Sequence, residues 1–455
     1  MERLTVIGGG LAGCEAAWQA AERGVDVLLL EMRPMKQTGA HVGAGLAELV
    51  CSNSLGSRMV DRAQGLLKEE IRRLNSMLLR CAEETAIPAG GALAVDRETF
   101  SKRVTELVRG HPRIHMMRGE ATEIPPGPTV IASGPLTSNR LSEAIAQLTG
   151  REHLFFYDAI APVVYADSID MNVAFRASRY GRGESEEGDY INCPFSREEY
   201  YFFVENLKSG DRIDLKDYEL QIEKGVDAGA HIFFEGCLPV EVLAQRGKEA
   251  LAFGPMRPAG IHYPDTRIRP YAIIQLRQDN FAGTLYNLVG FQTNLKFEEQ
   301  KRIFRMIPGL ERAEFARFGQ MHRNTFIYSP SLLLPTLQFR QRKDLFFAGQ
   351  IIGIEGYVGN IATGLLAGWN AARVIQDSSP LELPHETMLG SLCAYITGAS
   401  AQDFQPMKAN FGILPVLENL SQLKGKNERN AHYSRRSLEE LERFLQSYPL
   451  ESCEG

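Results

Sequence analysis

The sequence lacks paired cysteines, long apolar runs and a large excess of charge of either sign. Its seven cysteines are an odd number, and none stands in CxxC or CxxxC spacing. This scatter disfavours a disulfide framework and a structural zinc site, so we expect no bound metal. No window approaches about 18 uninterrupted apolar residues, and the start "MERLTVIGGG" is too polar and too rich in glycine for a signal peptide. We therefore expect a cytoplasmic protein with no membrane span.

The chain has 455 residues, of which 44% are hydrophobic and 23% charged, with a formal net charge of −6. This length suffices for two or three domains and a sizeable core. The charge excludes a surface that is basic throughout, but it leaves room for a local basic patch. The run "LKGKNERNAHYSRRS" at 423–437 either contacts phosphate groups of a nucleic acid or forms a solvated loop. The stretch 437–448 predicts a short amphipathic helix with Ser437 as its N-cap.

The first thirty residues carry the clearest pattern, a strand, a helix and a second strand. "RLTVIGGG" is β-rich, "LAGCEAAWQAAERG" is helical in pattern, and "VDVLLLE" is a second apolar run. Between the first strand and the helix stands a GxGxxG fingerprint, formed by Gly8, Gly9, Gly10, Leu11, Ala12 and Gly13. Such glycines let the backbone approach a pyrophosphate at the helix N-terminus. A plain glycine-rich turn is the alternative interpretation.

An acidic residue follows the fingerprint at the spacing that a dinucleotide site requires. Glu31 ends the second strand, 18 residues after Gly13, where its carboxylate can accept the hydroxyls of a ribose. The strand "GPTVIASGP" at 127–135 returns the chain to the same domain. A strand, a glycine turn and a helix recur at 344–375, and we expect Gly349 and Gln350 of this element to contact the cofactor. Such a late element favours FAD over NAD.

The middle of the chain differs in composition from both ends. Aromatic and β-branched runs alternate there with Pro/Gly turns and charged loops. We interpret residues 156–334 as an inserted α+β substrate and RNA domain, and residues 1–155 with 335–455 as a discontinuous Rossmann-type FAD-binding domain of the glutathione-reductase type. The expected fold class is therefore α/β.

Several long strings resemble one family over nearly the whole chain. They include "EMRPMKQTGAH", "AELVCSNSL", "PAGGALAVDRE", "FFEGCLPVEV", "MHRNTFI", "FFAGQIIGIEGYV" and "FQPMKANFGILP". The sequence resembles the bacterial folate- and FAD-dependent tRNA (uracil-54, C5)-methyltransferases, relatives of the GidA flavoproteins. The resemblance implies that a one-carbon unit passes from 5,10-methylenetetrahydrofolate to C5 of a uridine in the tRNA T-loop. It also implies that FAD, reduced by NADPH or NADH, supplies the reducing equivalents.

The resemblance also assigns roles to individual residues. It implies that Cys237 is the nucleophile at C6 of uracil and that Cys51 is a second functional thiol, with the two roles open to exchange. His322 matches an imidazole that stacks on the folate pterin, and Tyr357 matches an aromatic residue at the flavin. A core position is the alternative for each of the four. The other cysteines, at 14, 81, 193, 393 and 453, are expected to be structural.

Some residues depart from the family pattern near the expected site. Gly56 stands where a basic residue is usual, Tyr328 replaces a small amide, and "YVGNIATG" at 357–364 is altered. These departures keep open a paralogue that methylates ribosomal RNA, or a flavoprotein of this fold with altered chemistry. A disulfide reductase is disfavoured because no cysteine pair follows the first βαβ unit. A non-catalytic RNA-binding flavoprotein is disfavoured by the presence of Cys51, Cys237 and His322.

Overall fold

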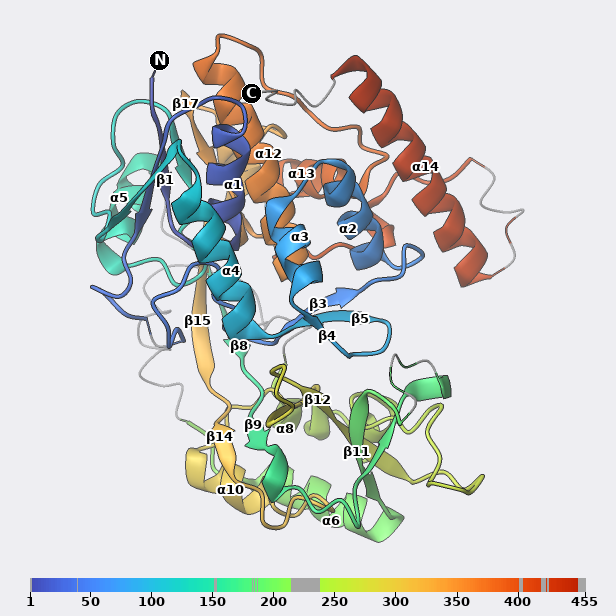
Figure 1. The fold of residues 1–455 in the computed structure, drawn as a ribbon. Helices are drawn as coiled ribbons and strands as arrows, with labels where there is room; N and C mark the ends of the chain where they lie inside the picture. The colour runs from blue at the N-terminus through green and yellow to red at the C-terminus, as the bar shows by residue number, and fades with distance from the viewer. Residues whose placement is uncertain are drawn as a thin grey trace.

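The computed structural model describes residues 2–38, 40–150, 154–181, 183, 185, 187–213, 238–400, 404–418, 423 and 425–448. Two sheets dominate this part of the chain, one in the upper and one in the lower half of Figure 1. The upper half contains both ends of the described chain, and the lower half is built from its middle (Figure 1). None of the described helices combines the length and apolar character needed to span a bilayer.

The first sheet is the mostly parallel sheet that the βαβ pattern predicts. Its strands are, in spatial order, β16 (Gln338–Phe339), β17 (Arg342–Phe347), β7 (Thr129–Ile131), β1 (Leu4–Ile7), β2 (Val27–Glu31) and β6 (Ile114–Arg118). Strands β17, β7, β1, β2 and β6 are parallel, and β16 pairs antiparallel with β17. The order reverses at β1, because β2 lies on one side of it and β7 on the other. In open α/β sheets such a switch point is where ligands bind.

Helices cover this sheet on both sides and extend its core. They are α1 (Leu11–Ala21), α2 (Ala63–Arg73), α3 (Met77–Glu84), α4 (Arg97–Gly110), α5 (Asn139–Thr149), α11 (Ser329–Leu332), α12 (Tyr357–Ile375), α13 (Met388–Gly398) and α14 (Lys426–Ser447). The antiparallel strands β3 (Ser54–Ser57), β5 (Ala92–Val95) and β4 (Ala86–Ile87) form a small sheet below α3 (Figure 1). The expected α/β class with a Rossmann-type fold is thus confirmed.

The second sheet is antiparallel and belongs to the middle of the chain. Its strands are, in order, β10 (Phe175–Ala177), β11 (Tyr190–Phe195), β12 (Ala272–Gln278), β13 (Leu285–Leu288), β9 (Val163–Tyr165) and β14 (Phe315–Arg317). Helices α6 (Arg197–Ser209), α8 (Val240–Gln245), α9 (Ala250–Phe253) and α10 (Phe297–Phe304) complete a core of its own. The paired strands β8 (Leu154–Ala159) and β15 (Met321–Phe326) run between the two halves (Figure 1). The division at 155/156 and 334/335 stays a prediction.

The two halves are joined by polar contacts next to the small sheet. Asn53 donates from Nδ2 to the carbonyl oxygens of Val95 (3.1 Å) and Gln278 (2.9 Å), which belong to different halves. Arg97 forms an ion pair with Asp279 at 3.1 Å, and both side chains are largely buried. These contacts fix the β12–β13 hairpin against the loop that precedes β3.

The C-terminal helix differs from its expected form. Helix α14 begins at Lys426 with Gly425 as its N-cap, so the expected N-cap at Ser437 is wrong, and the expected solvated loop is largely helical. Asn430 donates to the carbonyl oxygen of Asp61 at 3.1 Å, and Ser434 to that of Val60 at 2.7 Å. These long-range contacts stabilise the first turns of the helix, and a local capping pattern does not reveal them.

Ser437 instead contacts a buried acid that connects three helices. Its hydroxyl hydrogen-bonds Glu70 of α2, which also accepts the backbone N–H groups of Met388 (2.6 Å) and Leu389 (2.9 Å) at the start of α13. Burial raises the pKa of Glu70 to about 7, although these hydrogen bonds lower it. The folded chain therefore holds this proton more tightly than the unfolded chain, in which the carboxyl titrates near 4.5.

We predict that stability falls as the pH rises from 5 to 8, by up to about 3 kcal/mol from this group. The contribution is complete below the unfolded pKa and is lost as the pH passes the folded pKa near 7. Urea unfolding at several pH values should show that Glu70→Gln flattens this dependence. The neighbouring Glu69→Gln, at a more exposed position, should keep it. Equal pH slopes for wild type and Glu70→Gln would contradict the prediction.

Candidate active site

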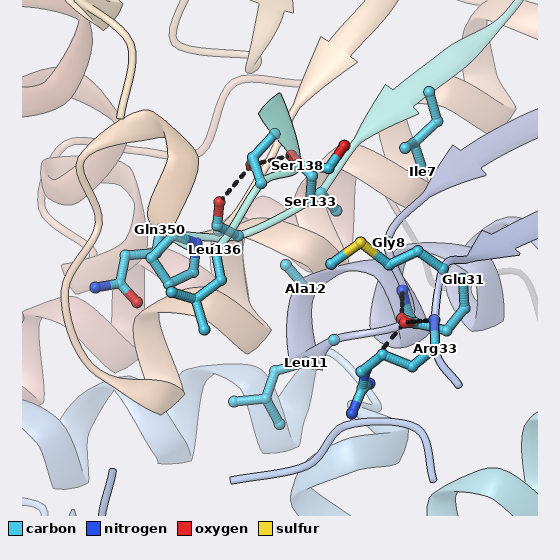
Figure 2. A pocket seen from close by; sticks show the side chains of 18 of the residues that line it. Ile7, Gly8, Leu11, Ala12, Glu31, Arg33, Ser133, Leu136, Ser138 and Gln350 are labelled. Atoms are coloured by element: carbon cyan, nitrogen blue, oxygen red, sulfur yellow. Dashed lines mark hydrogen bonds and ion pairs between the residues drawn. The ribbon is translucent and has the colours of Figure 1, made fainter. Parts of the chain in front are cut away.

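A pocket opens at the switch point of the parallel sheet. It holds about 970 Å³ of space free of protein atoms, open solvent at its mouth included. Figure 2 shows its two sides, with Glu31 and Arg33 near Gly8 on one and Ser133 and Leu136 on the other. The expected residues that line it are Gly8, Gly9, Gly10, Leu11, Ala12, Glu31, Gly349, Gln350 and Tyr357. The structure therefore brings the early and late glycine elements to one cavity.

The fingerprint glycines create this cavity by close backbone approach. Gly8 has φ +110°, and a Cβ there would lie 2.4 Å from the carbonyl oxygen of Ala132. Gly13 does not line the pocket, and a Cβ there would lie 1.8 Å from the oxygen of Gly8, so its role is the close fit of helix to strand. A Cβ at Gly10 would meet no protein atom within 4 Å. Gly10 thus leaves an open approach to the N-terminus of α1, which favours phosphate.

Glu31 is held by two groups beside this approach. Its carboxylate accepts the N–H of Gly9 at 2.8 Å and the Nε–H of Arg33 at 2.9 Å. Arg33 is fully buried and also pairs with Glu48 at 2.8 Å. Burial pushes the pKa of Glu31 upward, but the charge and hydrogen bonds of Arg33 outweigh it and leave the pKa below its usual value. The acid is therefore ionised and still has lone pairs for a ribose.

The late element closes the other end of the pocket. Gly349 packs so closely on α1 that a Cβ would lie 2.8 Å from Cβ of Ala12. Helix α12 begins at Tyr357, and its N-terminal N–H groups lie at the cavity, where they favour negative charge. Asn360 of α12 lines the pocket, and its buried Oδ1 has no hydrogen-bond partner among the described residues. A ligand with N–H donors at this end would satisfy that oxygen.

A second pocket adjoins the first and contains Cys51. It holds about 1220 Å³ of space free of protein atoms, again with open solvent included. Val50, Leu136, Gln350, Tyr357 and Asn360 line both pockets, so the two cavities share a wall. The thiol expected to be functional therefore lies next to the late end of the nucleotide pocket.

The loop that carries Cys51 is held by two side chains of the nucleotide half, one of which is paired with an acid of the inserted half. The hydroxyl of Tyr357 accepts the N–H groups of Cys51 (2.9 Å) and Ser52 (3.1 Å). Arg97 donates to the carbonyl oxygens of Leu49 (2.8 Å) and Cys51 (3.2 Å) while it pairs with Asp279. Burial, and then the electrostatic interaction with the Cys51 thiol group, raise the pKa of Tyr357, so it keeps its proton. The position of Cys51 is thus fixed by the nucleotide half and is linked to the inserted half through the ion pair of Arg97 with Asp279.

Sequence reasoning missed Arg277 of β12, which lines this pocket together with Cys51. Asn324 of β15, which the sequence suggested as a ligand-orienting residue without a defined role, lines it as well, and both side chains are largely buried. The departure at Gly56 has a structural reason, because φ is +80° there and a Cβ would lie 1.8 Å from Oε1 of Gln64. Gln64 fills the space that a basic side chain at position 56 would need. A neighbour eight residues away in α2 gives no local signal in the sequence.

Two expected residues cannot be placed in this geometry. Cys237 lies outside the described residues. His322 belongs to β15 and pairs with Asp158 of β8, but its side chain is not among those described. Among the cysteines expected to be structural, Cys14, Cys81, Cys193 and Cys393 are buried and free, which confirms that expectation for the four. Cys453 lies outside the described residues.

The fold and the pocket together define a dinucleotide-binding protein of the Rossmann type. FAD fits the residues present, because the open approach at Gly10 suits its pyrophosphate, Glu31 its ribose and the unpartnered Asn360 oxygen its ring N–H group. These contacts are the ones that a dinucleotide with a planar ring at the late end requires.

Known proteins that are similar to this chain belong to the same class and identify its family. The family model described as Glucose inhibited division protein A matches residues 3–379. Two solved structures of Aquifex aeolicus GidA superpose with TM-scores of 0.69 and 0.67 at 17% identity, covering 97% and 98% of this chain and 73% and 79% of theirs. These structures share the fold.

Curated relatives identify the family more closely. The "Methylenetetrahydrofolate--tRNA-(uracil-5-)-methyltransferase TrmFO" of Halalkalibacterium halodurans is 54% identical over 442 residues, which cover 97% of this chain and 98% of that protein. The protein of the same name from Heliobacterium modesticaldum is 55% identical over 443 residues, with the same coverage. The chain belongs to the GidA family and, by these relatives, to the TrmFO family.

We predict that Gly10→Ala weakens FAD binding by at least tenfold and leaves the fold intact. The added methyl group meets no protein atom but occupies the approach of the pyrophosphate to α1. Titration of the apoprotein with FAD measures the first effect, and thermal unfolding without FAD the second. Gly110→Ala at the end of α4 is the matched control, since a Cβ there also meets nothing. Unchanged FAD affinity in Gly10→Ala would show that the pyrophosphate lies elsewhere.

Proposed function

We propose that this protein is a folate- and FAD-dependent methyltransferase that forms 5-methyluridine at position 54 in the T-loop of tRNA. The observation that carries this proposal is the wall shared by the nucleotide pocket and the pocket of Cys51. A thiol beside the late end of a flavin pocket suits a reaction that combines nucleophilic addition to a ring with reduction. The names of the TrmFO relatives give methylenetetrahydrofolate, tRNA and methyl transfer to position 5 of uracil.

The chain's own residues hold the cofactor and orient the substrates. Reduced FAD, when bound, supplies the electrons that convert a methylene group into a methyl group. Gly8, Gly9, Gly10, Leu11 and Ala12 form the cradle for the pyrophosphate, and Gly13 supports it. At the other end Gly349, Gln350 and Tyr357 line the pocket, where they would hold the flavin ring. The N-terminus of α12 would favour negative charge on the reduced flavin.

Two thiols divide the work on uracil in this proposal. C5 of uracil is a weak nucleophile until a thiolate adds to C6, and we assign this addition to Cys237. After C5 has bonded to the one-carbon unit, a base must remove its proton, and Cys51 is the candidate for that step. The exchange of these two roles remains an alternative. His322 is proposed to stack on the folate pterin, since a planar ring is needed to align the donor with the flavin.

Partners and setting complete the proposal. NADPH or NADH would supply the electrons for the flavin, and tRNA would present the base after its extrusion from the T-loop. The proposed setting is the cytoplasm. No metal is needed, because the thiols and the flavin cover each chemical step. Residues 156–334 form the substrate and RNA domain and the remainder forms the FAD domain. Methylation of ribosomal RNA by a paralogue is the alternative that the altered segment 357–364 favours.

We predict that the holoenzyme transfers ¹⁴C from labelled 5,10-methylenetetrahydrofolate to 5-methyluridine of an unmodified tRNA transcript when NADPH is present. Cys237→Ala and Cys51→Ala should each lower this transfer by at least about 10³-fold, because each removes a reacting group. Cys393→Ala is the matched control and should stay near the wild-type rate, since this thiol is buried in α13. Nuclease mapping of the label identifies the modified uridine.

The outcome without label distinguishes the alternatives. A flavin that is bound and reducible by NADPH, with no label on tRNA, would refute the tRNA assignment. Label on ribosomal RNA under the same conditions would then support the paralogue.

A further inference from the structure

Arg277 is a buried arginine without a carboxylate partner in the described part of the chain. It lies on β12, its exposed fraction is 7%, and no ion pair to it occurs among the described residues. Its Nε–H donates to Oδ1 of Asn53 at 2.9 Å, and Asn53 is itself fully buried. Burial is also the main influence on the pKa of Arg277, which it lowers. A buried charge that has only a neutral partner is costly unless a ligand compensates it.

The end of this side chain faces the pocket that holds Cys51. Arg277 lines that pocket, and the hydrogen bond of Nε fixes the orientation of the guanidinium plane. Its terminal nitrogens, Nη1 and Nη2, have no hydrogen bond to any described residue. Neither nitrogen is completely enclosed by protein atoms, so both can be reached by a ligand in the cavity. Donors on the guanidinium are therefore available to a ligand in this pocket.

The nearby acid forms its ion pair with another arginine, although its charge raises the pKa of Arg277 and so offsets part of the effect of burial. Asp279, two residues further along the same hairpin, is already paired with Arg97 at 3.1 Å. Arg97 in turn donates to the carbonyl oxygens of Leu49 and Cys51, so its donors are used within the protein. The two arginines therefore differ in whether their donors are bonded within the protein. Arg97 fixes the cysteine loop, and Arg277 keeps its donors for the cavity.

A neutral polar group lines the same cavity. Asn324 of β15 is 4% exposed, and its carboxamide makes no hydrogen bond to any described residue. The oxygen of this amide can accept a ring N–H while its NH₂ group donates to one of the two carbonyl oxygens that flank that N–H. Uracil has this arrangement. The pocket thus offers a neutral group that can recognise the ring and a cation that can bind an oxygen on it.

We propose that Arg277 is a catalytic residue whose terminal N–H groups bind the O4 oxygen of the target pyrimidine and stabilise the negative charge that develops there. This inference rests on the proposed function. When a thiolate adds to the ring, its electron pair forms the S–C6 bond, and the C5=C6 pair moves to C4–C5. The C4=O4 pair moves onto oxygen, which becomes an enolate, so no electron is gained or lost. A fixed cation at O4 stabilises this enolate more than the neutral carbonyl, and that difference accelerates the step.

The test compares Arg277→Ala and Arg277→Lys with the wild-type holoenzyme under single-turnover conditions. The substrates are saturating tRNA transcript and labelled 5,10-methylenetetrahydrofolate. Loss of one such donor group typically slows the chemical step by about 10²–10³-fold, and we expect this loss in Arg277→Ala. The affinity for tRNA should change less than about threefold, because the added stabilisation arises only in the transition state. The rate of Arg277→Lys should lie between those of the wild type and Arg277→Ala, because lysine keeps the charge but not the planar donors.

Chemical rescue distinguishes a catalytic role from a structural one. Millimolar guanidinium ion should raise the rate of Arg277→Ala by at least tenfold, because it can fill the vacated site, and it should not accelerate the wild type. Arg179→Ala is the matched control, since Arg179 is a partly buried arginine whose donors bond to Gln275, Arg257 and Ala259 within the inserted part. It should keep the wild-type rate and show no rescue.

Each outcome bears on the proposal. Wild-type label transfer together with an Arg277→Ala rate within threefold of it would overturn the role of Arg277 and leave the proposed function standing. The role of Arg277 would also be overturned if Arg277→Ala is as slow as Arg277→Lys and guanidinium does not raise its rate. Absence of label transfer by the wild type would refute the proposed function itself. If Arg277→Ala fails to retain FAD, the test depends on Arg277→Lys. A tenfold lower rate of label transfer by Arg277→Lys at unchanged tRNA affinity would support the proposal. A wild-type rate in that variant would overturn it.

Discussion

The close contact between helices α1 and α12 is the constraint on which the rest of the molecule depends. A Cβ at Gly364 or at Gly368 would lie 2.3 Å from a backbone oxygen of α1, so glycine is required at both crossings. Because the two helices touch along their backbones, the cradle at the start of α1 and the N-terminus of α12 reach the same cavity. Two segments some 350 residues apart thus form one binding site.

A single hydroxyl group connects this cavity to the loop that carries Cys51. Tyr357 begins α12, lines both pockets and accepts two N–H groups from the loop of Cys51. Arg97 holds the same loop from the opposite side and pairs with Asp279 of the inserted part. A shift of either half would therefore displace the thiol. This arrangement explains how a lone cysteine on a loop, with no second cysteine nearby in sequence, can have a defined position.

Sequence reasoning succeeded where the chemistry depends on local order and failed where it depends on distant neighbours. The fingerprint from Gly8 to Gly13 and the acid Glu31 lie within one βαβ unit, so their spacing alone predicted the pocket, which all of them except Gly13 line. The start of α14 was missed because contacts to Val60 and Asp61 stabilise it. Arg277 was missed for the same reason. In the sequence it is one residue of an apolar strand, and only the fold brings it into the pocket that contains Cys51.

The arginines around the cysteine loop show how one residue type serves stability and reactivity at once. Arg97 has its charge balanced by Asp279 and its donors bonded to backbone oxygens, which makes it a structural connection. Arg277, on the same hairpin as Asp279, has a single neutral partner and an open end. Natural folds seldom keep a buried cation uncompensated, because well-packed apolar side chains are at least as stable. The pattern is therefore better explained by a ligand that carries negative charge during the reaction than by the folding of the chain.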